Sequence, residues 1–295
     1  MKAFPRVAPL IGALLFCAAP LTVSAQPTPG PVDSITWLSG EPVEPGVQPF
    51  AQALVDFLQT RWPEARQVIV QANARRSWQM VAAGEHACQV SSVRTPEREK
   101  LAFFTDTLIA PPQQLIVRRD KAALLPHNAA GEVELARLLA DAHLQGALID
   151  GRSYGDLVDA QLEKLPHSPS LVRYTASDFG SRMLTMLGKG RADYTIGYDV
   201  SLSHAPAEGG PLPSVALTSL PIAGASAPVR AGVACPRNAW GRVTIQHIDK
   251  LLSTPAGVAM LRQEAERWLS PETRQRYGPR LDEFYRERAR RSVIR

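Results

Sequence analysis

Apolar and polar positions follow a regular succession of short strands and helices in the first part of the chain. Residues 34–38 and 67–71 are β-rich runs. Residues 77–83 have the pattern of a short helix, and a strand through Cys88 to Val93 follows it. Apolar residues at helical spacing also lie between the first two runs: Phe50, Leu54, Phe57 and Leu58. This β-α-β-α-β order predicts a mostly parallel sheet covered by helices.

A second succession of the same kind follows an apolar segment that leaves the first unit. The expected strands are 115–117, 147–149, 171–174 and 194–196, and the expected helices are 133–142, 156–163 and one that begins at Ser177 and Asp178. Residues 205–230 are rich in Pro, Gly and Ala and suit a returning loop. A strand over 231–234 and closing helices over 240–251 and 256–268 complete the pattern. One α/β unit with a second unit inserted into it predicts two lobes.

The first 25 residues have the pattern of a cleaved secretory signal. Lys2 and Arg6 form a basic start, and residues 10–21 are mostly apolar but too short to span a bilayer. Residues 23–25, Val-Ser-Ala, form a small-residue cleavage site before Gln26. No later segment is apolar enough to cross a membrane. We therefore expect an exported, periplasmic protein that does not span the membrane.

The remaining residues suffice for two lobes with a sizeable core. We expect a first lobe formed by residues 26–110 and 228–288, a second lobe over 111–227, and a basic tail over 289–295. The formal net charge of +5 becomes +3 when two signal-segment cations are lost. The terminal arginines fit a solvated helix end: Arg286, Arg288, Arg290, Arg291 and Arg295. No basic stripe is interleaved with aromatic residues, so nucleic acid is not an expected partner.

The segment 95–100, Thr-Pro-Glu-Arg-Glu-Lys, directly follows the strand that ends near Val93. Pro96 is expected to end regular structure there and to preset a turn. Arg98 then lies just after a strand end, where α/β sheets place ligand-contacting groups. Its planar guanidinium matches a carboxylate or a phosphate. The alternative is a surface turn with a solvated charge cluster.

Residues 151–155, Gly-Arg-Ser-Tyr-Gly, lie between an expected strand and an expected helix. Free N–H groups at the helix start, together with the Ser153 hydroxyl, would form an anion site. The same letters spell the G-x-S-x-G nucleophile elbow of a serine hydrolase. Its partners would be Asp193 or Asp199, with His204 or His247. The missing oxyanion loop and the return of the chain to the first unit count against this enzyme, so no catalytic residue is expected.

Three longer segments resemble one known family. They are RTPEREKLAFFTDTLIAPPQQLIVRRD, GKGRADYTIGYD and the closing segment VRAGVACPRNAWGRVTIQHIDKLLSTPAGVAMLRQEAERWL. All three resemble segments of periplasmic solute-binding proteins of the polar-amino-acid type, family 3. The resemblance implies a type II periplasmic binding fold, in which two Rossmann-like lobes are joined by a hinge. It also implies a monomer that delivers a small solute to an ABC permease or a membrane sensor.

The resemblance assigns roles to particular residues. Arg98 would grip a ligand carboxylate, and the turn that holds Arg152, Ser153 and Tyr154 would help it, although Arg152 and Tyr154 replace the family's small residues. Tyr198 or Asp199 would take the opposite end of the ligand. The family's aromatic N-terminal loop is reduced here, and either Glu41 or Trp37 could reach the cleft. The alternative is an ordinary surface loop for Glu41 and a core position for Trp37. A ligand-free protein-interaction module on the same fold remains an alternative.

The positions of cysteine and histidine residues indicate whether a disulfide or a metal site is expected. Loss of the signal removes Cys17 and leaves Cys88 and Cys235. The resemblance places both on strands of one lobe, which favours a disulfide over two buried thiols. The six histidines are scattered along the chain, and the single pair of His86 and Cys88 does not by itself indicate a metal site. We expect neither a metal nor a cofactor.

Overall fold

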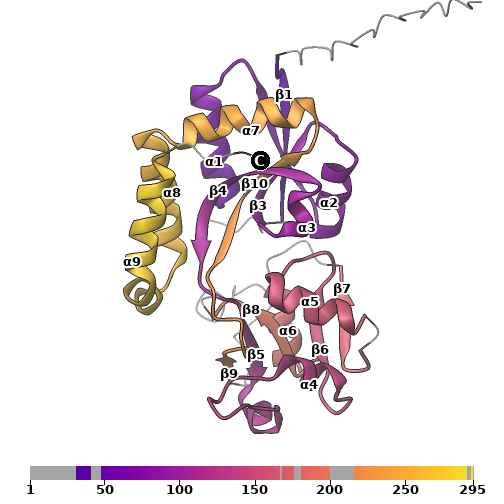
Figure 1. The fold of residues 1–295 in the computed structure, drawn as a ribbon. Helices are drawn as coiled ribbons and strands as arrows, with labels where there is room; N and C mark the ends of the chain where they lie inside the picture. Colours follow the sequence, from indigo (N-terminus) through magenta and orange to yellow (C-terminus); the bar gives the residue numbers. More distant parts are fainter. Residues whose placement is uncertain are drawn as a thin grey trace, which may run out of the picture.

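The computed structural model describes residues 31–40, 48–166, 168–175, 181–199, 216–290 and 294. It consists of a larger lobe and a smaller lobe, with two helices, α8 (Pro255–Trp268) and α9 (Pro271–Arg288), along one side (Figure 1). The two-lobed α/β fold is thereby confirmed. The expected signal segment, Glu41 and the expected helix start at Ser177 and Asp178 lie outside the described residues.

The larger lobe is built on a five-stranded sheet in the order β2-β1-β3-β10-β4. The strands are β1 (Ser34–Ser39), β2 (Arg66–Gln71), β3 (Ala87–Val93), β4 (Ala102–Ala110) and β10 (Val229–Pro236). β1 pairs in parallel with β2 and β3, whereas β10 is antiparallel to both β3 and β4. The expected mostly parallel sheet is therefore confirmed, because four strands run in one direction and only β10, which returns from the second lobe, runs in the other.

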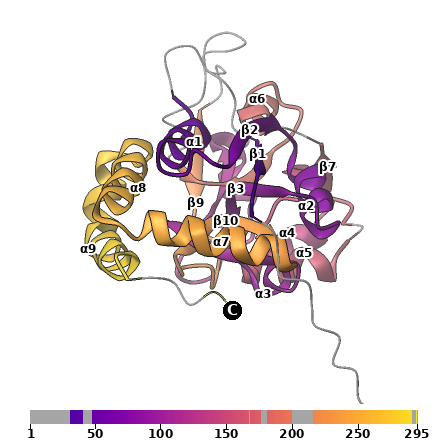
Figure 2. The ribbon, with the colours of Figure 1, turned by 90° about the horizontal axis from the view of Figure 1, so that it is seen from above.

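Helices cover this sheet and extend beyond it. They are α1 (Phe50–Arg61), α2 (Ala74–Ala82), α3 (Pro96–Glu99), α7 (Ala239–Leu252), α8 (Pro255–Trp268) and α9 (Pro271–Arg288). Side-chain oxygens of Asn238, Thr254 and Ser270 accept backbone N–H groups at the starts of α7, α8 and α9. Proline at the first position of α8 and α9 suits these starts. Figure 2 shows α8 and α9 beside each other at one edge of the lobe.

The smaller lobe has a second five-stranded sheet in the order β7-β6-β8-β5-β9. Its strands are β5 (Gln114–Arg118), β6 (Gly146–Ile149), β7 (Leu171–Tyr174), β8 (Tyr194–Gly197) and β9 (Leu217–Leu220). Its helices are the 3-10 helix η1 (Arg119–Leu124) and α4 (Leu135–Ala140), α5 (Asp156–Lys164) and α6 (Ser181–Gly188). The expectation of a loop over 205–230 is wrong where β9 and the start of β10 form. Two connections, β4 to β5 and β9 to β10, join the lobes (Figure 1).

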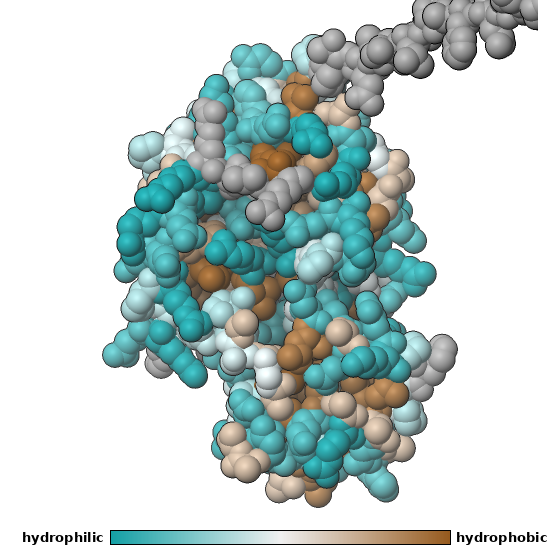
Figure 3. Space-filling view, in the orientation of Figure 1, coloured by the Kyte–Doolittle hydropathy of each residue, from teal (hydrophilic) through white to brown (hydrophobic). Residues whose placement is uncertain are grey.

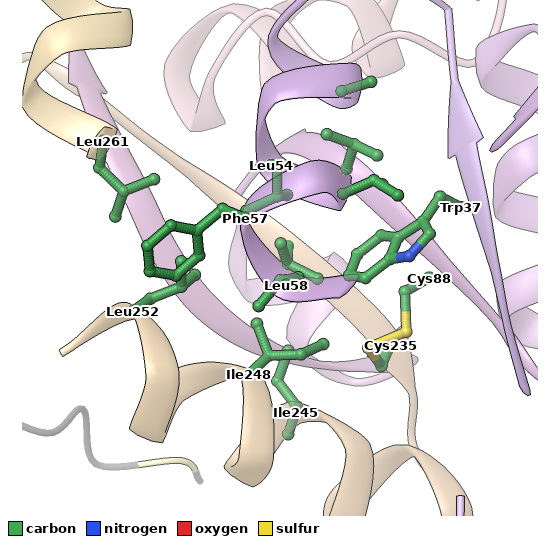
Figure 4. Close-up of a cluster of buried hydrophobic side chains, with 14 of the residues drawn as sticks. Trp37, Leu54, Phe57, Leu58, Cys88, Cys235, Ile245, Ile248, Leu252 and Leu261 are labelled. Carbon is green, nitrogen blue, oxygen red and sulfur yellow. A yellow bond between two sulfur atoms is a disulfide. The ribbon is translucent and has the colours of Figure 1, made fainter. Parts of the chain in front are cut away.

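The core of the larger lobe packs α1, α7 and α8 against the sheet around the buried ring of Trp37 (Figure 4). Trp37 is fully buried, and its indole N–H donates to the Gln67 side chain, which makes it a core residue. Cys88 on β3 and Cys235 on β10 form a disulfide in this cluster, with 4.3 Å between their Cα atoms. The expected disulfide is confirmed.

One terminal arginine is not solvated. Arg288, at the end of α9, is 3 % exposed and lies 3.1 Å from the Asp249 carboxylate of α7. Thr105 on β4 donates a 2.6 Å hydrogen bond to the same carboxylate, and Arg288 donates to the Ser253 hydroxyl. Burial lowers the pKa of Arg288, and the Asp249 charge opposes that shift. The expected solvated helix end is wrong for Arg288, whereas Arg286 and Arg290 are exposed. The face of the larger lobe drawn in Figure 3 is largely hydrophilic.

Candidate functional site

Arg98 is positioned by a short helical turn that begins directly after β3. The Thr95 hydroxyl caps this turn by accepting the backbone N–H of Arg98 at 3.2 Å. Pro96 takes the first helical position. The expectation that Pro96 ends regular structure is wrong, because a missing N–H and a fixed φ are favourable at the first position of a helix. The pattern of a capping threonine, a proline and two glutamates was a recognisable helix start.

The guanidinium of Arg98 is held from behind by its own lobe. Nη1 donates to the Val93 carbonyl at 3.0 Å and to the Ser92 hydroxyl at 3.3 Å. Its central carbon lies 4.6 Å from the centroid of the Trp78 ring, which is itself stacked near Phe104. These contacts fix the plane and the direction of the cation. Trp78, which packs against the core cluster around Phe104, thus also forms one wall of the site.

The same guanidinium reaches the second lobe. Nη2 of Arg98 donates to the Gly151 carbonyl at 3.2 Å, in the turn that follows β6. An ion pair of 2.9 Å between Arg75 and Asp150 lies beside it. Gly151 has a φ of +74°, and a Cβ there would lie 2.8 Å from the Arg75 backbone. Glycine is therefore needed where the two lobes approach each other. No spacing in the sequence indicated the ion pair of Arg75 with Asp150.

Burial and two nearby charges act on the Arg98 cation. Burial lowers its pKa to about 10, the Asp159 charge opposes this shift and the Arg152 charge adds to it. The side chain thus stays protonated at neutral pH. Among the described residues, its hydrogen bonds go only to neutral groups. A cation held in this way attracts an acid group.

The turn at residues 151–155 differs from the expected open anion site. The Tyr154 N–H donates to one oxygen of Asp159 at 2.7 Å, and the Ser153 hydroxyl donates to the other at 2.5 Å. The Gly155 N–H donates to the Ser153 hydroxyl at 3.2 Å. The expectation of free donors is therefore wrong for these groups. Asp159, one helical turn into α5, was missed, although a carboxylate in the first turns of a helix often reaches back in this way.

Tyr154 belongs to the core of the smaller lobe. Its side chain is 3 % exposed, and its hydroxyl accepts the Ile149 N–H at 2.9 Å. Burial raises the pKa of its phenol. The side chain anchors the turn to β6 and does not point to a ligand.

Arg152 and Tyr198 lie close to the same region. The Arg152 guanidinium is 5.5 Å from the centroid of the Tyr154 ring. Burial raises the pKa of the Tyr198 phenol and the Arg152 charge opposes this, which places the two side chains within electrostatic reach. The Tyr198 ring meets Trp268 of α8 edge-on at 5.1 Å, a contact between the lobes. Asp199 is half-buried, and its ligand role stays a prediction.

The residues proposed for a hydrolase do not come together. Ser153 donates to Asp159, and the His247 ring stacks on Trp62 in the other lobe at 4.0 Å. Asp193 accepts the Gln145 N–H, which gives it a structural role. His204 lies outside the described residues. The described residues thus give Ser153 no base of the expected kind.

Among the described residues, no group of three or more His, Cys, Asp or Glu side chains is placed to hold a metal ion. Within the same residues, no helix has both the length and the apolar character needed to cross a membrane. Cys88 is used in the disulfide, and the His86 ring stacks on Trp240.

Comparison of this fold with solved structures gives clear matches. A putative L-cystine ABC transporter from Listeria monocytogenes has a TM-score of 0.60 and 16% identity, over 81% of this chain and 96% of that one. A histidine kinase sensor domain similar to periplasmic binding proteins has a TM-score of 0.58 and 14% identity, over 80% and 95%. The ancestral amino acid-binding protein AncCDT-1, a precursor of cyclohexadienyl dehydratase, has a TM-score of 0.56 and 13% identity, over 81% and 96%. No family model and no curated protein matches the chain.

Proposed function

We propose that this chain is an exported, periplasmic solute-binding protein that captures a small carboxylate-bearing, amino-acid-like solute between its lobes. The observation that carries this proposal is the Arg98 guanidinium, a cation at the lobe junction that is held by neutral groups. Its stacking on Trp78 and its contact with the Gly151 carbonyl preorganise it for an acid group on the second lobe's side. Arg152, Tyr198 and Asp199 are the candidates for the rest of the ligand.

The fold supports delivery of the solute to a membrane partner. Structures with this fold include an ABC transporter protein and a sensor domain, so an ABC permease or a membrane sensor would recognise the closed form. Closure would shift an open–closed equilibrium and involve no chemical step. The arrangement around Ser153 supports a binding protein over a hydrolase, because that hydroxyl already donates to Asp159.

A thermal-shift screen tests the proposal directly. The purified protein is heated with amino acids, dicarboxylates, polyamines and small peptides. A solute present at ~100 times its Kd adds about 2.7 kcal/mol to the free energy of unfolding. Saturable stabilisation by one solute is the expected result. A flat screen, together with capture of a membrane protein, would instead favour the interaction module, and hydrolysis of a model ester that is lost in Ser153→Ala would favour the enzyme.

Replacement of Arg98 by alanine is expected to weaken binding of that solute about 10- to 150-fold, because hydrogen bonds to charged groups contribute about 1.5–3 kcal/mol. Isothermal titration calorimetry measures the loss. Affinity in the unaltered protein should also fall above about pH 10, because burial lowers the pKa of the Arg98 guanidinium to about 10 and the group then loses its proton.

The matched control is Arg66→Ala, which removes an exposed arginine from β2 in the same lobe. It should leave the affinity unchanged. Equal affinities of Arg98→Ala and the unaltered protein would show that the acid group does not bind at Arg98.

A further inference from the structure

Asp159 occupies the place where an acid group of a ligand would bind at the start of α5. Both of its carboxylate oxygens accept hydrogen bonds, one from the Ser153 hydroxyl at 2.5 Å and one from the Tyr154 N–H at 2.7 Å. Two accepted bonds on separate oxygens are the arrangement of an ionised carboxylate. The donors that could have held a ligand anion in this turn are therefore used by the chain itself.

The charge of Asp159 acts on the same space as Arg98. The Gly151 carbonyl that accepts from Arg98 and the two donors to Asp159 belong to one turn of five residues. The charges that bear on the Arg98 cation are those of Asp159, which stabilises it, and Arg152, which opposes it. The Asp159 carboxylate therefore offsets part of the Arg98 charge before any ligand binds, and a second acid group of a ligand near this turn would meet that carboxylate.

We propose that Asp159 is an internal counter-charge that restricts the ligand to a single acid group, bound at Arg98. The proposal rests on the proposed function, because it concerns the ligand of that same site. A second acid group near the turn would find its donors taken and would face the Asp159 carboxylate in a half-buried environment. Like charges that are close together in such surroundings repel strongly.

Matched ligand pairs that differ only in one acid group test this proposal. The probes are L-glutamine with L-glutamate, L-asparagine with L-aspartate, and succinamate with succinate, measured by calorimetry. For the pair that binds, the protein should prefer the amide member by about tenfold or more, since one added like charge is the sole difference. Asp159→Asn keeps the shape but removes the charge, so it should abolish or reverse this preference.

Two further variants make the result specific. Ser153→Ala removes a hydrogen bond to Asp159 but keeps the charge, and it should preserve the preference for the amide. Arg152→Gln lowers the charge of the site by one and should increase that preference. If thermal melting shows that Asp159→Asn does not fold, the inference is tested with Arg152→Gln instead.

Equal or tighter binding of the diacid by the unaltered protein would overturn the inference and leave the solute-binding function intact. If Asp159→Asn and Arg152→Gln both leave the preference for the amide unchanged, the inference is also overturned. If no amide and no acid of the three ligand pairs binds, the inference is wrong for these ligands. The wide thermal-shift screen then decides the function separately, because any other stabilising solute would preserve it and a flat screen would remove it.

Discussion

Replacement of Cys88 and Cys235 together by alanine is expected to lower the free energy of unfolding by about 5 kcal/mol. The disulfide joins residues with a sequence separation of 147. The chain-entropy model gives about 5 kcal/mol for a closed loop of that length. Alanine is the suitable replacement because both sulfurs lie in the apolar cluster of the larger lobe. Urea unfolding followed by tryptophan fluorescence measures the effect, since Trp37 lies in the same cluster.

Chemical reduction provides the control for this experiment. A reductant should lower the urea midpoint of the unaltered protein and leave that of the double alanine variant unchanged. Equal midpoints for the unaltered protein and the double variant would contradict a stabilising role of the bridge.

Replacement of Arg288 by methionine is expected to cost about 3–5 kcal/mol, because it leaves a buried carboxylate without its cation. That carboxylate belongs to Asp249, which is 2 % exposed and also accepts from Thr105. Methionine has a similar length and adds no new charge. Urea unfolding at neutral pH gives the free energy difference.

Arg286→Ala is the matched control, since Arg286 is exposed in the same last turn of α9. It should change stability by less than about 0.5 kcal/mol. The double variant Arg288→Met with Asp249→Asn should be more stable than Arg288→Met alone, because neither residue then leaves an unpaired buried charge. A midpoint of Arg288→Met equal to that of the unaltered protein would argue against the buried ion pair.

Much of the fold followed from apolar periodicity. The sequence predicts β1, α1, β2, the second-lobe strands β5 to β8 and the helices α7 and α8 to within a few residues. Periodicity could not place β9, because its segment lies among Pro, Gly and Ala residues and forms a strand only by pairing with β5. It also missed β4, a largely buried strand whose pairing with β10 involves residues more than 100 positions away.

The site was predictable where local chemistry decides it and not where folding brings distant residues together. Arg98 was predicted as a site residue from its place after a strand. Its contacts with Trp78 and Gly151 depend on packing between helices and lobes that no spacing reveals. Arg288 shows the same limit, because an arginine in a basic tail is usually solvated and this one meets Asp249 only through the fold.

The position of β10 between β3 and β4 has a consequence for the order in which the chain can fold. The smaller lobe takes all its strands from one uninterrupted stretch, residues 114–220, so its sheet can form as soon as that stretch is available. The sheet of the larger lobe lacks a central strand until residues 229–236 have followed. Domains that depend on contacts distant in sequence fold slowly. The N-terminal lobe should therefore be the last to acquire its native structure, and the inserted lobe the first.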